Sequence, residues 1–83
     1  MTMENQVVDT NDSYLGVEIF GEDASTVSEW FRKRDYETKQ TEAGYLVVAN
    51  PRRGGILHLC GSLLDALRCA SPDTRARLVP KLH

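Results

Sequence analysis

Residues 13–20, with the sequence SYLGVEIF, alternate between apolar and other side chains. A period of two is typical of a half-buried β-strand, and Gly21 ends it. The residues before this strand, 1–12, are polar and acidic without periodicity, so we expect a flexible acidic tail followed by a single domain over residues 13–83. The two faces of the predicted strand carry Leu15, Val17 and Ile19 on one side and Tyr14, Glu18 and Phe20 on the other.

Two later segments have the period of an amphipathic helix. In the first, residues 22–35, Asp23 is a good N-cap and the last turn is basic, which suits the helix dipole. The second, residues 56–70, has an apolar side that covers about half of the helix circumference. The apolar sides consist of Ala24, Val27, Trp30 and Phe31 in the first helix, and of Ile56, Leu57, Leu59, Cys60, Leu63, Leu64, Ala66, Leu67 and Ala70 in the second.

The remaining segments predict a hairpin and a short helix. Residues 36–50 have a polar arm, a turn near residues 42–44 and an apolar arm, and Pro51 ends the second arm because proline cannot donate to a sheet ladder. Ser71 followed by Pro72 matches an N-cap and the first position of a helix. We therefore expect a short final helix over residues 72–79, ended by Pro80.

The order strand, helix, strand, strand, helix, short helix predicts a two-layer α+β domain. A connection of helix length between the first two strands favours a parallel, right-handed crossover. The third strand is the most apolar, so we place it in the middle of a three-stranded mixed sheet of order 2-3-1. Both main helices then cover one face, and strand 13–20 lies at an edge of the sheet.

Composition narrows the class of protein. Of the 83 residues, 41% are hydrophobic and 27% are charged, which is typical of a globular domain. The longest apolar run, residues 46–49, is far shorter than the roughly 20 residues of a membrane span, and the N-terminus lacks the features of a secretory signal. Two cysteines are too few to staple a secreted domain, so we expect a cytoplasmic protein with reduced thiols.

The net charge of −2 hides an uneven distribution, because residues 1–49 carry ten acids and four bases whereas residues 50–83 carry two acids and six bases. Part of the basic half is the turn NPRRGG at residues 50–55. A glycine-rich turn before a helix can bind an anion, but this one matches neither a P-loop nor a dinucleotide fingerprint. We favour a structural corner, with anion or nucleic-acid binding as the alternative. The residues of that alternative site are Arg52, Arg53, Gly54, Gly55, Arg75 and Arg77.

No pattern in the sequence predicts catalysis. His58, Ser62 and Asp65 share one helix face, but His58 and Asp65 are about 10 Å apart along the axis, too far for a hydrogen-bonded triad. The spacing of the potential metal ligands matches no zinc motif. We therefore expect no enzymatic activity, no cofactor and no metal. Those potential ligands are His58, Cys60, Cys69 and His83.

The candidate interaction surface is the sheet face opposite the helices. If Leu46 and Val48 point toward the helices, the alternate residues of the same strand point outward and join the aromatic residues of strand 13–20. Aromatic side chains with a polar rim are enriched at protein interfaces, and an apolar edge strand can pair with another chain. The alternative is that a terminal segment covers this face. The residues of the predicted surface are Tyr14, Glu18, Phe20, Tyr45 and Val47.

These observations lead to the hypothesis of a non-catalytic protein-binding module. It would be a small intracellular inhibitor, adaptor or regulator, bacterial or phage-encoded, that binds a larger protein complex and self-associates as a homodimer through strand 13–20 or the outer sheet face. No membrane partner is expected. The alternative hypothesis is a regulator that binds nucleic acid with its basic C-terminal half, since the acidic first half would repel phosphates.

Overall fold

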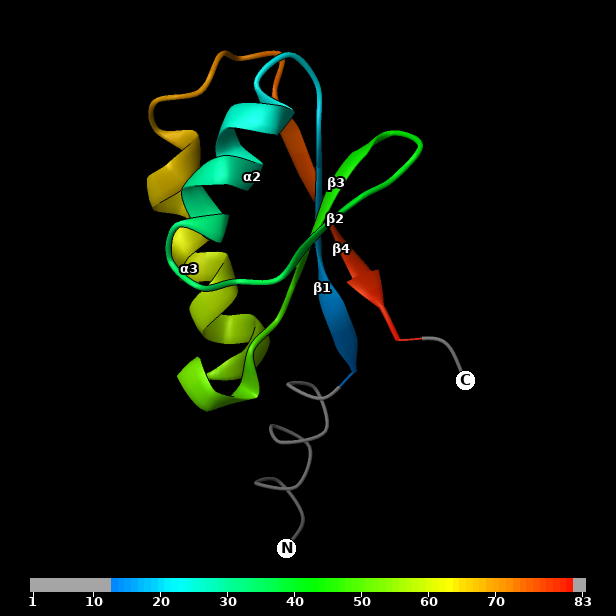
Figure 1. Cartoon of the computed structure of the whole chain (residues 1–83), viewed down its shortest axis with the longest axis vertical. Helices are drawn as coiled ribbons and strands as arrows, with labels where there is room; N and C mark the ends of the chain where they lie inside the picture. The colour runs from blue at the N-terminus through cyan, green and yellow to red at the C-terminus, as the bar shows by residue number, and fades with distance from the viewer. Residues whose placement is uncertain (1–12, 82–83) are drawn as a thin grey trace, which may run out of the picture.

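Four strands and two helices form two layers in the computed structural model, which describes residues 13–81. The predicted tail, residues 1–12, and the last two residues lie outside the described part of the chain. Both helices lie on the same side of the sheet (Figure 1), as the sequence predicts. The elements are β1 (Tyr14–Phe20), α2 (Ala24–Arg32), β2 (Thr38–Gln40), β3 (Gly44–Val48), the 3-10 turn η1 (Pro51–Arg53), α3 (Gly55–Leu67) and β4 (Arg75–Pro80).

The sheet has the order β2-β3-β1-β4, and all neighbouring strands are antiparallel. The α+β class and the order 2-3-1 of the first three strands are confirmed, but the sheet has four strands rather than three and is not mixed. Strand β1 lies between β3 and β4. The prediction that strand 13–20 forms an edge is therefore wrong. Because both edges of β1 are paired with neighbouring strands, two copies cannot pair through this strand.

The fourth strand replaces the predicted helix over residues 72–79. Asp23 Oδ2 accepts the Ser71 N–H at 2.7 Å, and the Thr74 N–H donates to the Ser71 carbonyl at 3.0 Å, so Pro72 lies in a turn rather than at the start of a helix. Residues 75–78 after this turn, RARL, alternate between polar and apolar side chains. A strand forms because the second edge of β1 has backbone groups that need partners.

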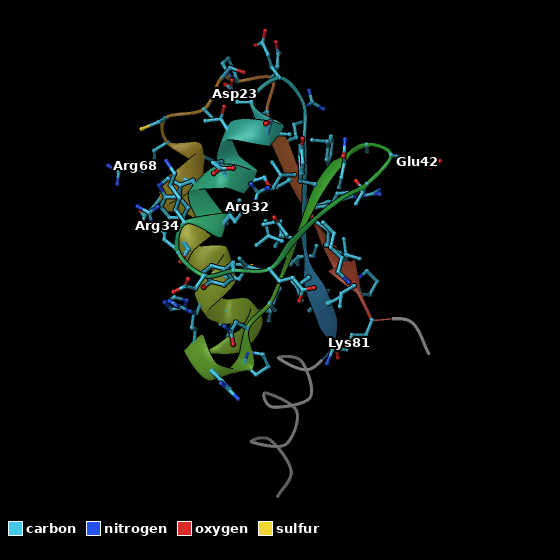
Figure 2. All side chains as sticks on the ribbon, viewed as in Figure 1. Asp23, Arg32, Arg34, Glu42, Arg68 and Lys81 are labelled. Atoms are coloured by element: carbon cyan, nitrogen blue, oxygen red, sulfur yellow. The ribbon has the colours of Figure 1, made fainter. Side chains whose placement is uncertain are left out.

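Asp23 joins the start of α2 to this turn. It occupies the N-cap position, as expected, but its side chain makes no cap hydrogen bond. Its own N–H donates to Thr74 Oγ1 at 2.9 Å while its carboxylate holds the Ser71 amide. Figure 2 shows Asp23 at the end of the molecule where this connection passes the start of α2. One residue thus fixes the entry of α2 and the turn that leads into β4.

The cross-strand pairs show which residues face the helices. Val17 pairs with Val47, and Ile19 pairs with Tyr45; directly opposed residues project to the same face of a sheet. Val17, Ile19 and Val47 are almost completely buried, so this face is the one that packs against the helices. The rest of the buried apolar core consists of Ala24, Val27, Phe31, Tyr36, Ile56, Leu59 and Ala66.

The predicted orientation of β3 is therefore wrong by one residue. Tyr45 and Val47 point toward the helices, and Leu46 and Val48 point away from them. A one-residue slip exchanges the two faces of a strand. The reason is that the run YLVVA is apolar at every position, so its sequence does not define which alternate set is buried.

Candidate functional site

The five residues of the predicted interface are not brought together. Val47 is 0% exposed in the core, and the rings of Tyr14 and Tyr45 are half-buried against that core. Only Glu18 and Phe20 lie on the face opposite the helices, and an interface role for these two stays a prediction. The aromatic surface that the sequence predicts does not form, because β3 has the opposite orientation.

Glu18 links three segments across the outer face of the sheet. Arg77 of β4 donates to Glu18 Oε1 through Nε at 2.8 Å, and its Nη2 lies 2.7 Å from the same oxygen. The Thr41 hydroxyl donates to Oε2 at 2.6 Å from the turn between β2 and β3. The hydrogen bonds from Thr41 and Arg77 lower the pKa of Glu18, against a smaller opposing effect of burial. With a side chain only 8% exposed, Glu18 holds the sheet together rather than standing free at the rim of an interface.

The NPRRGG corner uses its backbone amides internally. Arg52 N–H donates to Asn50 Oδ1 at 3.0 Å, and the N–H groups of Arg53 and Gly55 donate to the Asn50 carbonyl. The Gly54 N–H donates to Pro51. Gly54 has φ 111°, and a Cβ there would lie 3.0 Å from the Cβ of His58. These amides already have acceptors, which favours a structural corner over a phosphate cradle.

Two of the residues considered for catalysis, His58 and Asp65, have other partners. His58 Nδ1 forms a 2.7 Å hydrogen bond with the Tyr36 hydroxyl, and Asp65 lies 3.7 Å from Arg68, so these two groups do not form a relay with Ser62. Burial raises the pKa of the Cys60 thiol, which disfavours its reactive form. Within residues 13–81 no cluster of three potential metal ligands is found; His83 lies outside that range.

The basic residues of the alternative site lie on separate elements. Arg52 and Arg53 belong to η1, whereas Arg75 and Arg77 belong to β4. Figure 1 shows that η1 and the start of β4 lie at opposite ends of the molecule. In Figure 2, Arg34 and Arg68 lie on the helix layer, away from Lys81 at the end of β4. The structure therefore separates Arg52 and Arg53 from the start of β4, whereas Lys81 lines a pocket together with Pro51, Gly54 and Gly55 of the corner.

A different surface stands out where α3 meets β4. We call it the α3–β4 surface and define it as Leu57, Gly61 and Leu64 of α3 together with Leu78 of β4. The three leucines are 64%, 70% and 44% exposed. A Cβ built at Gly61 would meet no atom of the described part of the chain within 4 Å. The result is an apolar stripe with a flat centre.

The stripe lies on the flank of α3 that is directed toward β4. Cys60 and Leu63 of α3 line a small pocket together with Ala76 and Leu78 of β4. At 100° per residue, Leu64 lies about 40° beyond Cys60 around the helix, and Leu57 about 60° beyond it. The other flank of α3 faces α2, where Ala66 lines a second pocket with Val27 and Trp30. The exposed leucines of α3 therefore lie next to the contact between α3 and β4, and they extend this apolar region to the solvent-exposed surface.

Beside this stripe, β4 is an edge strand of the sheet that residues 13–81 form. The Lys81 N–H donates to the Ser13 carbonyl at 2.9 Å, so the odd-numbered residues of β4 direct their backbone groups toward β1. By alternation, Ala76 and Leu78 direct N–H and C=O groups to the free edge. Pro80 offers only its carbonyl there, which is where proline is tolerated in a sheet.

The sequence places Leu57 and Leu64 on the apolar side of the second helix and does not separate them from the buried residues there. One signal was available: the apolar side of residues 56–70 covers about half of the circumference, and a helix that packs on a single sheet buries a stripe little wider than about 100°. The apolar residues outside that stripe are therefore not buried against the sheet. Because the sequence predicts a helix over residues 72–79, it does not reveal that this segment forms an edge strand.

No protein-family model, curated protein sequence or solved structure matches the chain. Within the described residues, neither helix is long and apolar enough to cross a membrane.

Proposed function

We propose that the chain is a non-catalytic protein-binding module and that its contact surface is the α3–β4 surface. One observation carries the proposal. Of the four large hydrophobic side chains that are exposed among residues 13–81, three lie in the α3–β4 surface, next to a free strand edge. Single exposed leucines are ordinary, but an apolar patch beside unpaired backbone groups is a feature of binding surfaces.

The surface also indicates what a partner supplies. The edge of β4 takes an extended segment, since the N–H and C=O groups of Ala76 and Leu78 can continue the sheet. Above that edge, Leu57 and Leu64 can contact apolar side chains of a second segment of the partner, which lies above the extended one. A partner that provides both layers fits an inhibitor, adaptor or regulator that acts by binding alone. We place this module in the cytoplasm, where its free thiols, Cys60 and Cys69, stay reduced.

The test compares complexes captured from source-cell lysate by the wild-type chain and by the double variant L57E/L64E. Captured material is treated with nuclease, and the intact complexes are weighed by native mass spectrometry. The control is S25E/T26E, which adds the same two charges at exposed positions on α2. We expect wild type and control to recover protein complexes of fixed stoichiometry, and L57E/L64E to lose them while it remains folded.

Two results would contradict the proposal. Identical complexes with all three chains would show that binding uses another surface. Recovery of nucleic acid without nuclease, and of nothing after it, would favour the alternative function and direct attention to Arg52 and Arg53. In that case binding would also weaken steeply with salt.

A further inference from the structure

We infer that a second copy of this chain occupies the α3–β4 surface, in a two-fold symmetric dimer that joins the two sheets through their β4 strands. This inference rests on the proposed function, because it names the partner at the same surface. The inference is supported by the arrangement of the surface. The free edge of β4 and the apolar flank of α3 can both meet their own copies about one common two-fold axis. A symmetric interface requires that each copy present the same patch to the other.

The strand layer allows two pairings. With a two-fold axis perpendicular to the sheet, the helices of both copies lie on the same side of the joined sheet. One residue near the centre of β4 then lies directly opposite the same residue of the second copy. That residue is Arg77 or Leu78. Pairing at Arg77 would place two like charges opposite each other, which is unfavourable. Both registers use the N–H and C=O groups of Ala76 and Leu78 that point to the free edge, so the charges decide in favour of pairing at Leu78. This pairing also places the two exposed Leu78 side chains together beneath the helices.

The helix layer is centred at the same level. The midpoint between Leu57 and Leu64 falls between Cys60 and Gly61, and Cys60 lines the pocket that also contains Leu78. An axis through the Leu78 pair therefore passes the middle of the apolar stripe. The two α3 helices then lie antiparallel, with Leu57 of one copy against Leu64 of the other. Gly61 carries no side chain at the crossing, which lets the helix backbones approach.

The size of this face matches a weak dimer. The 13 residues of α3 span about 20 Å, and the six residues of β4 also span about 20 Å. The two layers are stacked about 10 Å apart. Together they give a face of about 20 by 20 Å, about 400 Å² on each copy and about 800 Å² in total, which is smaller than the interface of a stable complex and has the size of a weak, transient one. We therefore expect a weak dimer that forms in the high micromolar range.

Sedimentation velocity of the full chain, from low to high micromolar concentration, tests the dimer. We expect a concentration-dependent shift from monomer to dimer. G61Q should weaken the dimer at least about tenfold while the monomer becomes more stable, since glutamine favours a helix more than glycine does. Misfolding cannot explain a variant that is more stable yet monomeric. The control S25Q, at an exposed position of α2, should dimerise like wild type.

Disulfide trapping tests the register. In a C60A/C69S background, L78C should form a covalent dimer with oxidised glutathione, because paired residues in an antiparallel ladder have Cα atoms about 5.5 Å apart, within reach of a disulfide. R77C in the same background should react much more slowly. Faster trapping of R77C would overturn the register, and a chain that stays monomeric at high micromolar concentration would overturn the dimer.

The failure of the dimer and the failure of the proposed function are distinguishable. If the chain is monomeric but L57E/L64E still loses a captured heterologous protein, the second-copy inference is wrong and the binding surface stands. If the chain is monomeric and L57E/L64E captures the same complexes as wild type, both are wrong.

Discussion

Replacing Val47 by alanine tests which face of β3 is buried. The side chain is 0% exposed between the sheet and the helices. Loss of two methyl groups removes about 1.6 kcal/mol of transfer free energy, at about 0.8 kcal/mol each. A residual cavity of about 40 Å³ adds about 1 kcal/mol. The expected loss in free energy of unfolding is therefore about 2.5 kcal/mol.

The matched control is V48A, the same substitution at the next residue, which is half-buried on the outer face. Both changes lose the same β-propensity, so the difference between them reports burial. We expect V48A to cost less than about 1 kcal/mol. Urea unfolding followed by circular dichroism gives both values, and V47A should also lower Tm by about 10 °C or more. A V48A variant as destabilised as V47A, or more so, would refute the assignment of the faces.

Three further variants test particular contacts. The hydrogen bonds from Thr41 and Arg77 lower the pKa of Glu18 in the folded chain. The ionised Glu18 therefore stabilises the fold fully above about pH 4.3, the ordinary pKa of glutamate, and this stabilisation is lost as the pH falls through the lowered pKa. Urea titrations at a series of acidic pH values should show this loss in wild type and not in E18Q. S28A should raise the free energy of unfolding by about 1 kcal/mol in the same assay, because the buried Ser28 hydroxyl has no hydrogen-bond partner among residues 13–81; an unchanged or lower stability would contradict this. G54A should lower Tm, with a cost above about 1 kcal/mol, since residue 54 has a positive φ and little space near His58; a Tm equal to that of wild type would show that the corner can relax.

The parts of the fold that sequence predicts well have a strong period and clear ends. The alternation that ends at Gly21 and the helical period of residues 56–70 correspond to β1 and α3. The hairpin follows from its polar and apolar arms. In each case the local pattern and the tertiary contacts favour the same structure, so the pattern alone is sufficient.

The errors occur where the local pattern has two meanings. Ser71-Pro72 fits both the start of a helix and a turn, and the contact with Asp23, 48 residues earlier, decides for the turn. The apolar residues of β3 fit either orientation, and the pairing with β1 decides it. Both decisions depend on long-range contacts that no local pattern contains. The α3–β4 surface depends on the first of them, because Leu78 belongs to the strand that replaces the predicted helix.

Amide hydrogen exchange along β4, followed by NMR, tests most directly whether the free edge of this strand binds another chain. Arg77 and Val79 direct their N–H groups to β1 and serve as internal controls, protected in every state. The amides of Ala76 and Leu78 should exchange rapidly in dilute solution and become protected at high concentration or with a captured partner. Rapid exchange of Ala76 and Leu78 in the assembled state would contradict the proposal that β4 is the binding edge.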